Sequence, residues 1–293
     1  MSSPAWREHA TVFECDSDRL IGIVTQPERP FETGVVIIVG GPQYRAGSHR
    51  QFTLLARQLA EQGIASLRFD YRGMGDSEGD MRTFEDIDDD IRAAIDTFMA
   101  QASNIQQVML WGLCDAASAA LYYGHTDPRV KGLALLNPWV HSEAGAARAR
   151  LKHYYLSRLL SKSFWAKFIA GKVRVGASLG DLAHSTRQAS APNETNSAAP
   201  TDPRHGRPGY IDRMLNGLRK FEGKVQIILS GNDLTAQEFA ELIKGDASWR
   251  KAVADKKVST REIKAANHTF ASSAWRDQAG IVTCNLATEI HDA

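Results

Sequence analysis

The sequence lacks the long apolar segments that membrane insertion requires. No run approaches the ~20 apolar residues of a transmembrane helix. Charged residues also interrupt the amino-terminal segment, MSSPAWREHATVFECDSDR, where a secretory signal peptide needs an unbroken apolar stretch. These absences predict a cytoplasmic protein without a transmembrane segment.

Cysteine is scarce, and neither sign of charge prevails. Cys15, Cys114 and Cys284 are far apart, odd in number and without Cys-x-x-Cys spacing, which argues against a disulfide framework and a zinc site. The 35 basic and 34 acidic side chains nearly balance, so the whole chain gives no electrostatic argument for a nucleic-acid partner. The acidic run at 85–90 opens a predicted helix, where carboxylates suit a solvated first turn. We therefore predict no metal, no cofactor and no nucleic-acid partner.

Strand-like and helix-like segments alternate along most of the chain. Apolar or alternating runs predict strands at 11–15, 20–25, 34–39, 64–70, 107–111, 130–136, 224–230 and 257–263. Helical periodicity predicts helices at 51–62, 84–100, 115–124, 210–221, 236–243 and 271–290. This alternation favours an α/β fold with a mainly parallel, eight-stranded sheet and helices on both faces. Ligands bind such sheets at the carboxyl ends of the strands.

One segment, 141–209, interrupts the alternation and divides the core into 1–140 and 210–293. Its part at 145–172 is basic, aromatic and helical in pattern, which predicts a helical lid insertion. The part at 185–208 is rich in Ser, Ala, Pro, Asn and Thr, and we expect it to be flexible. A basic lid suits an anionic partner, such as an acyl carrier protein, a coenzyme A (CoA) thioester or a membrane surface. The alternative is an amphipathic lid whose aromatic side chains cover the site while its lysines face water.

The segment Gly-Leu-Cys-Asp-Ala at 112–116 follows an apolar strand and precedes a helix-forming run. A nucleophile on a sharp strand-to-helix turn needs small residues two positions before and after it, and Gly112 and Ala116 meet that need. The turn also places the Cys114 thiol at a helix amino terminus, which favours the thiolate. The alternative is a buried structural cysteine. We predict that Cys114 is a catalytic nucleophile.

Two further polar residues follow predicted strands downstream. Asp233 lies in Ser-Gly-Asn-Asp at 230–233, and His268 lies in Asn-His-Thr-Phe at 267–270. The order nucleophile, acid and histidine, each at a strand's carboxyl end, resembles that of α/β-hydrolases. Taken singly, Asp233 could form a turn and His268 could cap a helix. Together with Cys114, they predict a Cys-His-Asp triad.

The turn at 40–44, Gly-Gly-Pro-Gln-Tyr, is placed where an oxyanion hole is expected. Pro42 has no N–H to donate, so we assign the hole to the main-chain N–H groups of Gln43 and Asp115. The candidate substrate-binding residues are aromatic: Tyr44, Trp139, Tyr155 and Trp165.

Resemblance to known families is strongest with the α/β-hydrolase superfamily, whose plan nearly the whole chain outside the lid follows. The segment Asp-Tyr-Arg-Gly-Met-Gly-Asp-Ser-Glu-Gly at 70–79 resembles the loop after the fourth strand of that fold and has the wrong spacing for a dinucleotide fingerprint. Within the superfamily, the segments 112–118, 231–239 and 268–270 resemble the type 1 hydrolases associated with the exosortase A system, which are encoded in bacterial exopolysaccharide gene clusters. Serine is the usual nucleophile in the superfamily, whereas position 114 is cysteine.

These residues predict acyl transfer through a covalent acyl-cysteine. If water accepts the acyl group, the enzyme is an ester or thioester hydrolase acting on a small-molecule or carrier-bound acyl substrate. If a hydroxyl or amine accepts it, the enzyme is an acyltransferase. A third hypothesis is a catalytically silent module that binds a carrier protein or a membrane surface. The usual activity of superfamily members favours the hydrolase over the other two hypotheses.

Overall fold

The computed structural model describes residues 5–41, 43–140, 209–255 and 257–293. Eight strands form one sheet in the order β1-β2-β4-β3-β5-β6-β7-β8. The strands are β1 (Trp6–Cys15), β2 (Asp18–Pro27), β3 (Thr33–Ile38), β4 (Ser66–Asp70), β5 (Gln107–Leu113), β6 (Val130–Leu136), β7 (Lys224–Ser230) and β8 (Val258–Ile263). Only the hairpin β1–β2 and its pairing with β4 are antiparallel, and the six remaining strands run parallel.

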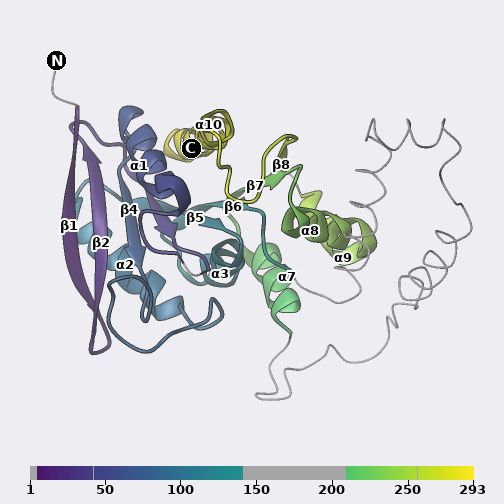
Figure 1. Ribbon diagram of the computed structural model, residues 1–293, viewed down its shortest axis with the longest axis horizontal. Coiled ribbons are helices and arrows are strands. Elements are labelled where there is room, and N and C mark those ends of the chain that lie inside the picture. Colours follow the sequence, from purple (N-terminus) through teal and green to yellow (C-terminus); the bar gives the residue numbers. More distant parts are fainter. Residues whose placement is uncertain (1–4, 42, 141–208, 256) are drawn as a thin grey trace, which may run out of the picture.

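Helices cover both faces of the sheet (Figure 1). They are α1 (Gln51–Glu61), α2 (Asp88–Gln101), α3 (Asp115–Tyr123), α7 (Tyr210–Lys220), α8 (Leu234–Gly245), α9 (Ala247–Val253) and α10 (Ser273–His291), with short 3-10 turns at Ser48–Arg50 and Gly124–Thr126. One core cluster joins the sheet to α2, α3, α7, α8 and α9, and the other joins it to α1 and α10. The strand β3 is buried along its whole length, as its unbroken apolar sequence requires between two helical layers.

The parallel strands end along one edge of the sheet, and this edge carries the polar turns. The register aligns Ile38 of β3 with Gly112 of β5, and Ser230 of β7 with Ile263 of β8. The turns after these strands therefore lie beside one another, although they are far apart in the sequence.

The structure confirms the predicted α/β-hydrolase fold, with its eight-stranded, mainly parallel sheet and helices on both faces. It adds α9, which the sequence pattern did not predict, and begins α2 at Asp88 rather than Phe84. The predicted lid, including its flexible part at 185–208, lies outside the described residues. Within the described part of the chain, no helix has both the length and the apolar character needed to span a bilayer.

The acidic run before and within α2 differs from the prediction of a solvated turn. Asp90 is fully buried and receives hydrogen bonds from the main-chain N–H and the guanidinium of Arg72. Arg72 is itself only 2% exposed. The prediction was wrong for Asp90 because its partner comes from the loop after β4, a distant contact that helical periodicity does not report.

Candidate active site

Cys114 lies on a strained turn between β5 and α3. Its backbone has φ 62° and ψ −122°, a left-handed conformation that costs a residue with a side chain about 1–3 kcal/mol. A Cβ atom at Gly112 would lie 2.5 Å from the main-chain carbon of Ala116, so only glycine fits there. The small neighbours predicted from the sequence are therefore required by the geometry of the turn.

Hydrogen bonds from neighbouring strands hold this turn in place. The N–H of Cys114 donates to the carbonyl of Leu136 at 2.9 Å, and its carbonyl accepts from the N–H of Trp139 at 3.2 Å. Its side chain is partly exposed, whereas Cys15 and Cys284 are buried, and all three cysteines are free thiols. Cys114 is thus the cysteine that a substrate can reach.

The structure brings Asp233 and His268 together at the same edge of the sheet. Nδ1 of His268 lies 2.9 Å from Oδ2 of Asp233, whose side chain is only 9% exposed. The same carboxylate oxygen accepts the N–H of Ala236 and caps α8. Two main-chain bonds join the acid and histidine turns: Gly231 N–H to Ile263 at 3.1 Å and Asn232 N–H to Ala266 at 3.0 Å.

The electrostatics of this edge favour a protonated histidine. Hydrogen bonds, first with Asp233 and second with Cys114, raise the pKa of His268 to about 10 against a partial desolvation by burial. The imidazole of His268 therefore carries a proton at neutral pH. His268 is hydrogen-bonded to Asp233, and the Cys114 side chain contributes to the raised pKa of the imidazole, so the three predicted triad residues interact at this edge.

A buried asparagine, which the sequence reasoning missed, supports the histidine turn. Asn137 follows β6 with φ 44° and is fully buried. Its Oδ1 accepts the N–H of Ser230 at 2.8 Å, and its Nδ2 donates to Oγ of Ser230 and to the carbonyl of His268 at 2.9 and 3.1 Å. Oγ of Ser230 in turn donates to the carbonyl of Asn267 at 2.9 Å. The only available signal was a polar residue at the end of an otherwise apolar strand.

The turn after β3 packs directly against the nucleophile. A Cβ atom at Gly40 would lie 2.5 Å from the carbonyl oxygen of Leu113. The carboxylate of Asp115 accepts the N–H of Gly41 at 3.0 Å and the N–H of Ala116 at 2.9 Å. The N–H of Gln43 donates to the carbonyl of Gly41 at 2.8 Å. The predicted oxyanion turn is thus beside Cys114, with the Gln43 N–H engaged inside the turn.

Asp115 contributes two different groups to this region. It is the first residue of α3, where a main-chain N–H has no carbonyl partner within the helix. Its side chain is partly buried, and this burial raises the pKa of the carboxyl despite the hydrogen bonds from Gly41 and Ala116. The sequence motif predicted a role only for the main-chain N–H of Asp115.

Comparison with known protein families identifies the family of this chain. Residues 32–207 match the family model described as serine aminopeptidase, S33, a match that spans more than half of the chain. The chain belongs to this family. The protein is therefore an α/β-hydrolase enzyme, which favours the catalytic hypotheses over a silent binding module. No curated protein matches the chain.

Solved structures of similar fold include several esterases. An esterase of Pyrococcus furiosus shares 12% identity with this α/β-hydrolase, with a TM-score of 0.63 and coverage of 97% of this chain and 91% of that one. The esterase domain of a Rhodothermus marinus protein shares 18% identity, with a TM-score of 0.59 and coverage of 97% and 98%. Est1E from Butyrivibrio proteoclasticus, solved with ferulic acid bound, shares 16% identity, with a TM-score of 0.60 and coverage of 97% and 100%. At these identities the likeness shows the fold alone.

Aromatic side chains of this α/β-hydrolase cluster around Trp139, which follows β6. Trp139, whose N–H binds the Cys114 carbonyl, stacks on Tyr210 with ring centroids 5.3 Å apart and packs edge-on against Phe84 at 5.5 Å. Tyr44, in the turn after β3, is 51% exposed. The other two candidate substrate-binding residues, Tyr155 and Trp165, lie outside the described residues.

The residues that the structure describes provide no group of metal ligands. Among these residues, no three His, Cys, Asp or Glu side chains come together in a group that could hold a metal ion. His268 and Asp233 are instead engaged with each other. The predicted lack of a metal and of a cofactor stays a prediction for the whole chain.

Proposed function

We propose that the protein is an acyl hydrolase that cleaves an ester or thioester through an acyl-cysteine intermediate. The observation that carries the proposal is the connected set of Asp233, His268 and Cys114 at the carboxyl edge of the sheet. The strained turn supports it, because backbone strain of this kind is retained where it presents a reactive side chain. A buried structural cysteine would have no need of either feature.

The first half of the reaction forms the acyl-enzyme. The sulfur of Cys114, its proton held by His268, attacks the substrate carbonyl, and a carbon–sulfur bond forms. The carbon–oxygen or carbon–sulfur bond of the substrate then breaks, and His268 gives its proton to the departing alkoxide or thiolate. Asp233 keeps the imidazole ring oriented and stabilises its positive charge throughout.

The second half of the reaction releases the acid. His268 accepts a proton from water as the water oxygen bonds to the acyl carbon. The carbon–sulfur bond then breaks, so the thiolate and the protonated histidine are restored. The main-chain N–H groups of Asp115 and Gln43 are proposed to donate to the oxyanion in both halves. For Gln43, this requires the N–H to leave the Gly41 carbonyl when substrate arrives.

Proposals on the substrate rest on similarity and on local sequence. Esterases among the similar folds favour a carboxylic ester as the first substrate class to test. The segments at 112–118, 231–239 and 268–270 support a link to bacterial exopolysaccharide synthesis through the exosortase-associated type. An acyl carrier protein or CoA as the acyl donor stays a proposal, because the basic segment that suggested it lies outside the described residues.

A second candidate, acyltransferase, is favoured by the identity of the nucleophile. An acyl-cysteine is a thioester, which amines and hydroxyl groups attack readily. The aromatic side chains of Trp139, Tyr210 and Phe84 also offer a surface that could exclude water beside Cys114. Hydrolase and transferase share the first half-reaction and differ only in the acceptor.

Intact-protein mass spectrometry tests the shared step. The enzyme is mixed with p-nitrophenyl esters, acyl-CoA thioesters and an acylated carrier protein, and is quenched in acid at short times. We expect a mass gain equal to the acyl group, mapped to Cys114 by peptide analysis and released by hydroxylamine. Addition of glycerol or a primary amine then distinguishes transfer from hydrolysis by the mass of the product.

The controls separate Cys114 from the other thiols. Cys114→Ala should lose the adduct and the turnover. Cys284→Ala, which removes a buried thiol whose pKa burial raises to about 11, should keep both. An adduct that persists in Cys114→Ala, or turnover that this substitution leaves intact, would refute the acyl-cysteine.

A further inference from the structure

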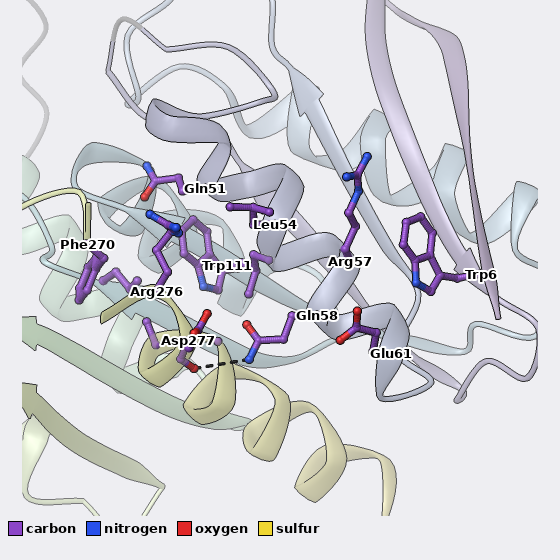
Figure 2. A pocket seen from close by; sticks show the side chains of 14 residues that line it. Trp6, Gln51, Leu54, Arg57, Gln58, Glu61, Trp111, Phe270, Arg276 and Asp277 are labelled. Atoms are coloured by element: carbon purple, nitrogen blue, oxygen red, sulfur yellow. Dashed lines mark hydrogen bonds between the residues drawn. The ribbon is translucent and has the colours of Figure 1, made fainter. Parts of the chain in front are cut away.

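A groove lies between α1 and α10, on the face of the sheet that these two helices cover. Its volume is about 480 Å³, within the range of sites that hold small molecules. Leu54 and Gln58 of α1 form one wall, Ala279 and Gly280 of α10 form the other, and Trp111 of β5 lies in the floor (Figure 2). Neither Cys114 nor His268 nor Asp233 lines it, so it is not the catalytic pocket.

A buried hydrogen-bond donor in this groove has no partner. The Trp111 side chain is 4% exposed, and its Nε1 makes no hydrogen bond to the described residues. The ring is held by an edge-on contact with Phe52, with centroids 5.5 Å apart. Figure 2 shows the ring beside Leu54 and Arg276. An unpartnered buried N–H costs about 1–3 kcal/mol, so an acceptor supplied by a ligand would satisfy it.

A second donor points to the same chemistry. Nε of Arg57, which also lines the groove, is buried without a hydrogen-bond partner among the described residues. The terminal nitrogen of the same guanidinium is already paired with Glu8 at 2.8 Å, and the group lies over the Trp6 ring. The remaining need of both side chains is therefore an acceptor oxygen and not a further charge.

The rest of the surface is mixed, with apolar side chains in the channel and Gln51, Gln58, Glu61, Arg276 and Asp277 also in the lining. Leu54, Leu55, Leu136 and Phe270 line the groove together with the Trp111 ring. The small residues Gly280 and Ala279 leave room on the α10 side of the groove. A Cβ atom at Gly280 would lie 1.9 Å from Oε1 of Gln58. The groove thus combines an apolar channel with buried donors.

We propose that this groove is a second ligand site, for a compound that has an alkyl chain and a carbonyl oxygen, with the oxygen bound by the indole N–H of Trp111. Its occupant contacts Phe270, which lies two residues after His268 in a left-handed conformation with φ 49°. The site is therefore placed to act on the histidine turn as an effector site, and it is independent of the chemistry at Cys114.

Nuclear magnetic resonance of the indole groups tests the proposal in the full-length Cys114→Ala variant, where no acyl-enzyme can form. Of the 6 tryptophans, Trp111 is assigned as the indole N–H signal absent from Trp111→Phe. Octanoate and octanamide are titrated as charged and neutral carbonyl probes, and octyltrimethylammonium as an alkyl probe without an acceptor. We expect a saturable downfield shift of the Trp111 signal with a carbonyl probe and none with the ammonium.

Matched variants complete the test. Trp111→Phe keeps the ring against Phe52 but should weaken binding of the carbonyl probe about tenfold, the effect of one lost hydrogen bond. Trp249→Phe, at a buried tryptophan that does not line the groove, should leave the affinity unchanged. Leu54→Trp should block the groove and abolish binding. The proposal would be overturned by an unchanged chemical shift of the Trp111 signal with both carbonyl probes. It would also be overturned if Trp111→Phe bound the carbonyl probe as tightly as the protein with Trp111, or if the ammonium bound as tightly as the carbonyl probes.

Discussion

Nδ1 of His268 lies 2.9 Å from Oδ2 of Asp233, and this one carboxylate oxygen also caps α8 through the N–H of Ala236. Asp233 therefore has a structural role and an electrostatic one. The two roles are separable, because a second aspartate, Asp246, caps α9 without any histidine partner among the described residues. This pair of caps provides a matched control for the proposed acid.

Asp233→Asn should lower kcat by about 10³ to 10⁴, the effect expected when the orienting carboxylate of a triad is neutralised. The pKa of His268 should fall from about 10, because its largest cause is the hydrogen bond with Asp233. Steady-state kinetics and a ¹⁵N titration of the histidine ring measure the two effects. Asp246→Asn should lose comparable helix-cap stability but keep kcat, and an equal loss of kcat in both variants would contradict a triad role.

The raised pKa of His268 also predicts how stability depends on pH. The folded protein holds the proton up to about pH 10, whereas an unfolded histidine releases it near 6.5. This contribution to the free energy of unfolding is complete below about pH 6.5 and is lost as the pH rises to about 10. Urea denaturation at pH 6, 8 and 10 measures the free energy of unfolding. This free energy should decline more steeply with rising pH in wild type than in His268→Gln. If the free energy of unfolding declined equally in both proteins, groups other than His268 would control its dependence on pH.

Cys114→Ser should lose at least about 10²-fold in kcat/KM, although serine is the usual nucleophile of the superfamily. The hydrogen bond with Asp233, the largest cause of the raised pKa of His268, remains in this variant, so the imidazole still favours its protonated form and is a poor base for a hydroxyl group. A thiol does not have this difficulty, because its proton can already reside on the histidine. The residual activity of the serine variant should rise with pH as the imidazole loses its proton. A serine variant as active as wild type at pH 7 would contradict a nucleophile matched to a protonated histidine.

Asn137→Ala should lower both stability and kcat. The substitution leaves the buried N–H of Ser230 and the carbonyl of His268 without partners, which costs about 1–3 kcal/mol. Thermal unfolding and kinetics measure the two losses. Asn104→Ala is the matched control, since Asn104 donates to the carbonyls of Pro30 and Phe31 before the amino-terminal ends of β5 and β3, whereas the triad residues follow the carboxyl ends of their strands. It should lower stability without lowering kcat beyond the effect of unfolding, and a kcat effect equal to that of Asn137→Ala would argue against a positioning role.

The placement of the three proposed triad residues at one edge was predictable because each of them follows an apolar strand within a short motif. Parallel strands end at one edge, so the fold prediction alone brought Cys114, Asp233 and His268 together. Asn137 could not be assigned in this way, since its partners Ser230 and His268 come from two later turns. Its role depends on a register that the sequence does not specify.

Other features depend on packing between distant elements. The burial of Asp90 requires Arg72, and the groove at Trp111 requires α1 and α10 to lie side by side on one face of the sheet. The helix α9 was missed because it has only seven residues, too few for a clear hydrophobic period. The cytoplasmic location and the carrier partner stay predictions, since they rest on composition and on the segment outside the described residues.

The side chain of Asp115 gives the last prediction, because it joins the oxyanion turn to the nucleophile turn. Its carboxylate accepts the N–H groups of Gly41 and Ala116, and burial raises the pKa of this carboxyl. Protonation on the acid side therefore occurs at a higher pH than for an exposed aspartate, and it weakens both bonds. Activity should fall with this protonation, as the turn that carries Gln43 loosens.

Asp115→Ala should lower kcat about 10- to 100-fold with little change in KM, because the main-chain N–H of residue 115 remains while the turn after β3 loses its support. Asp115→Asn cannot titrate, so the acid limb of its kcat/KM profile should move to lower pH, even if its maximum is reduced. Profiles from pH 4 to 10 with one activated ester measure both effects. If Asp115→Asn kept the acid limb of wild type, the limb would belong to the Cys114 and His268 pair, and Asp115 would act only through its main-chain N–H.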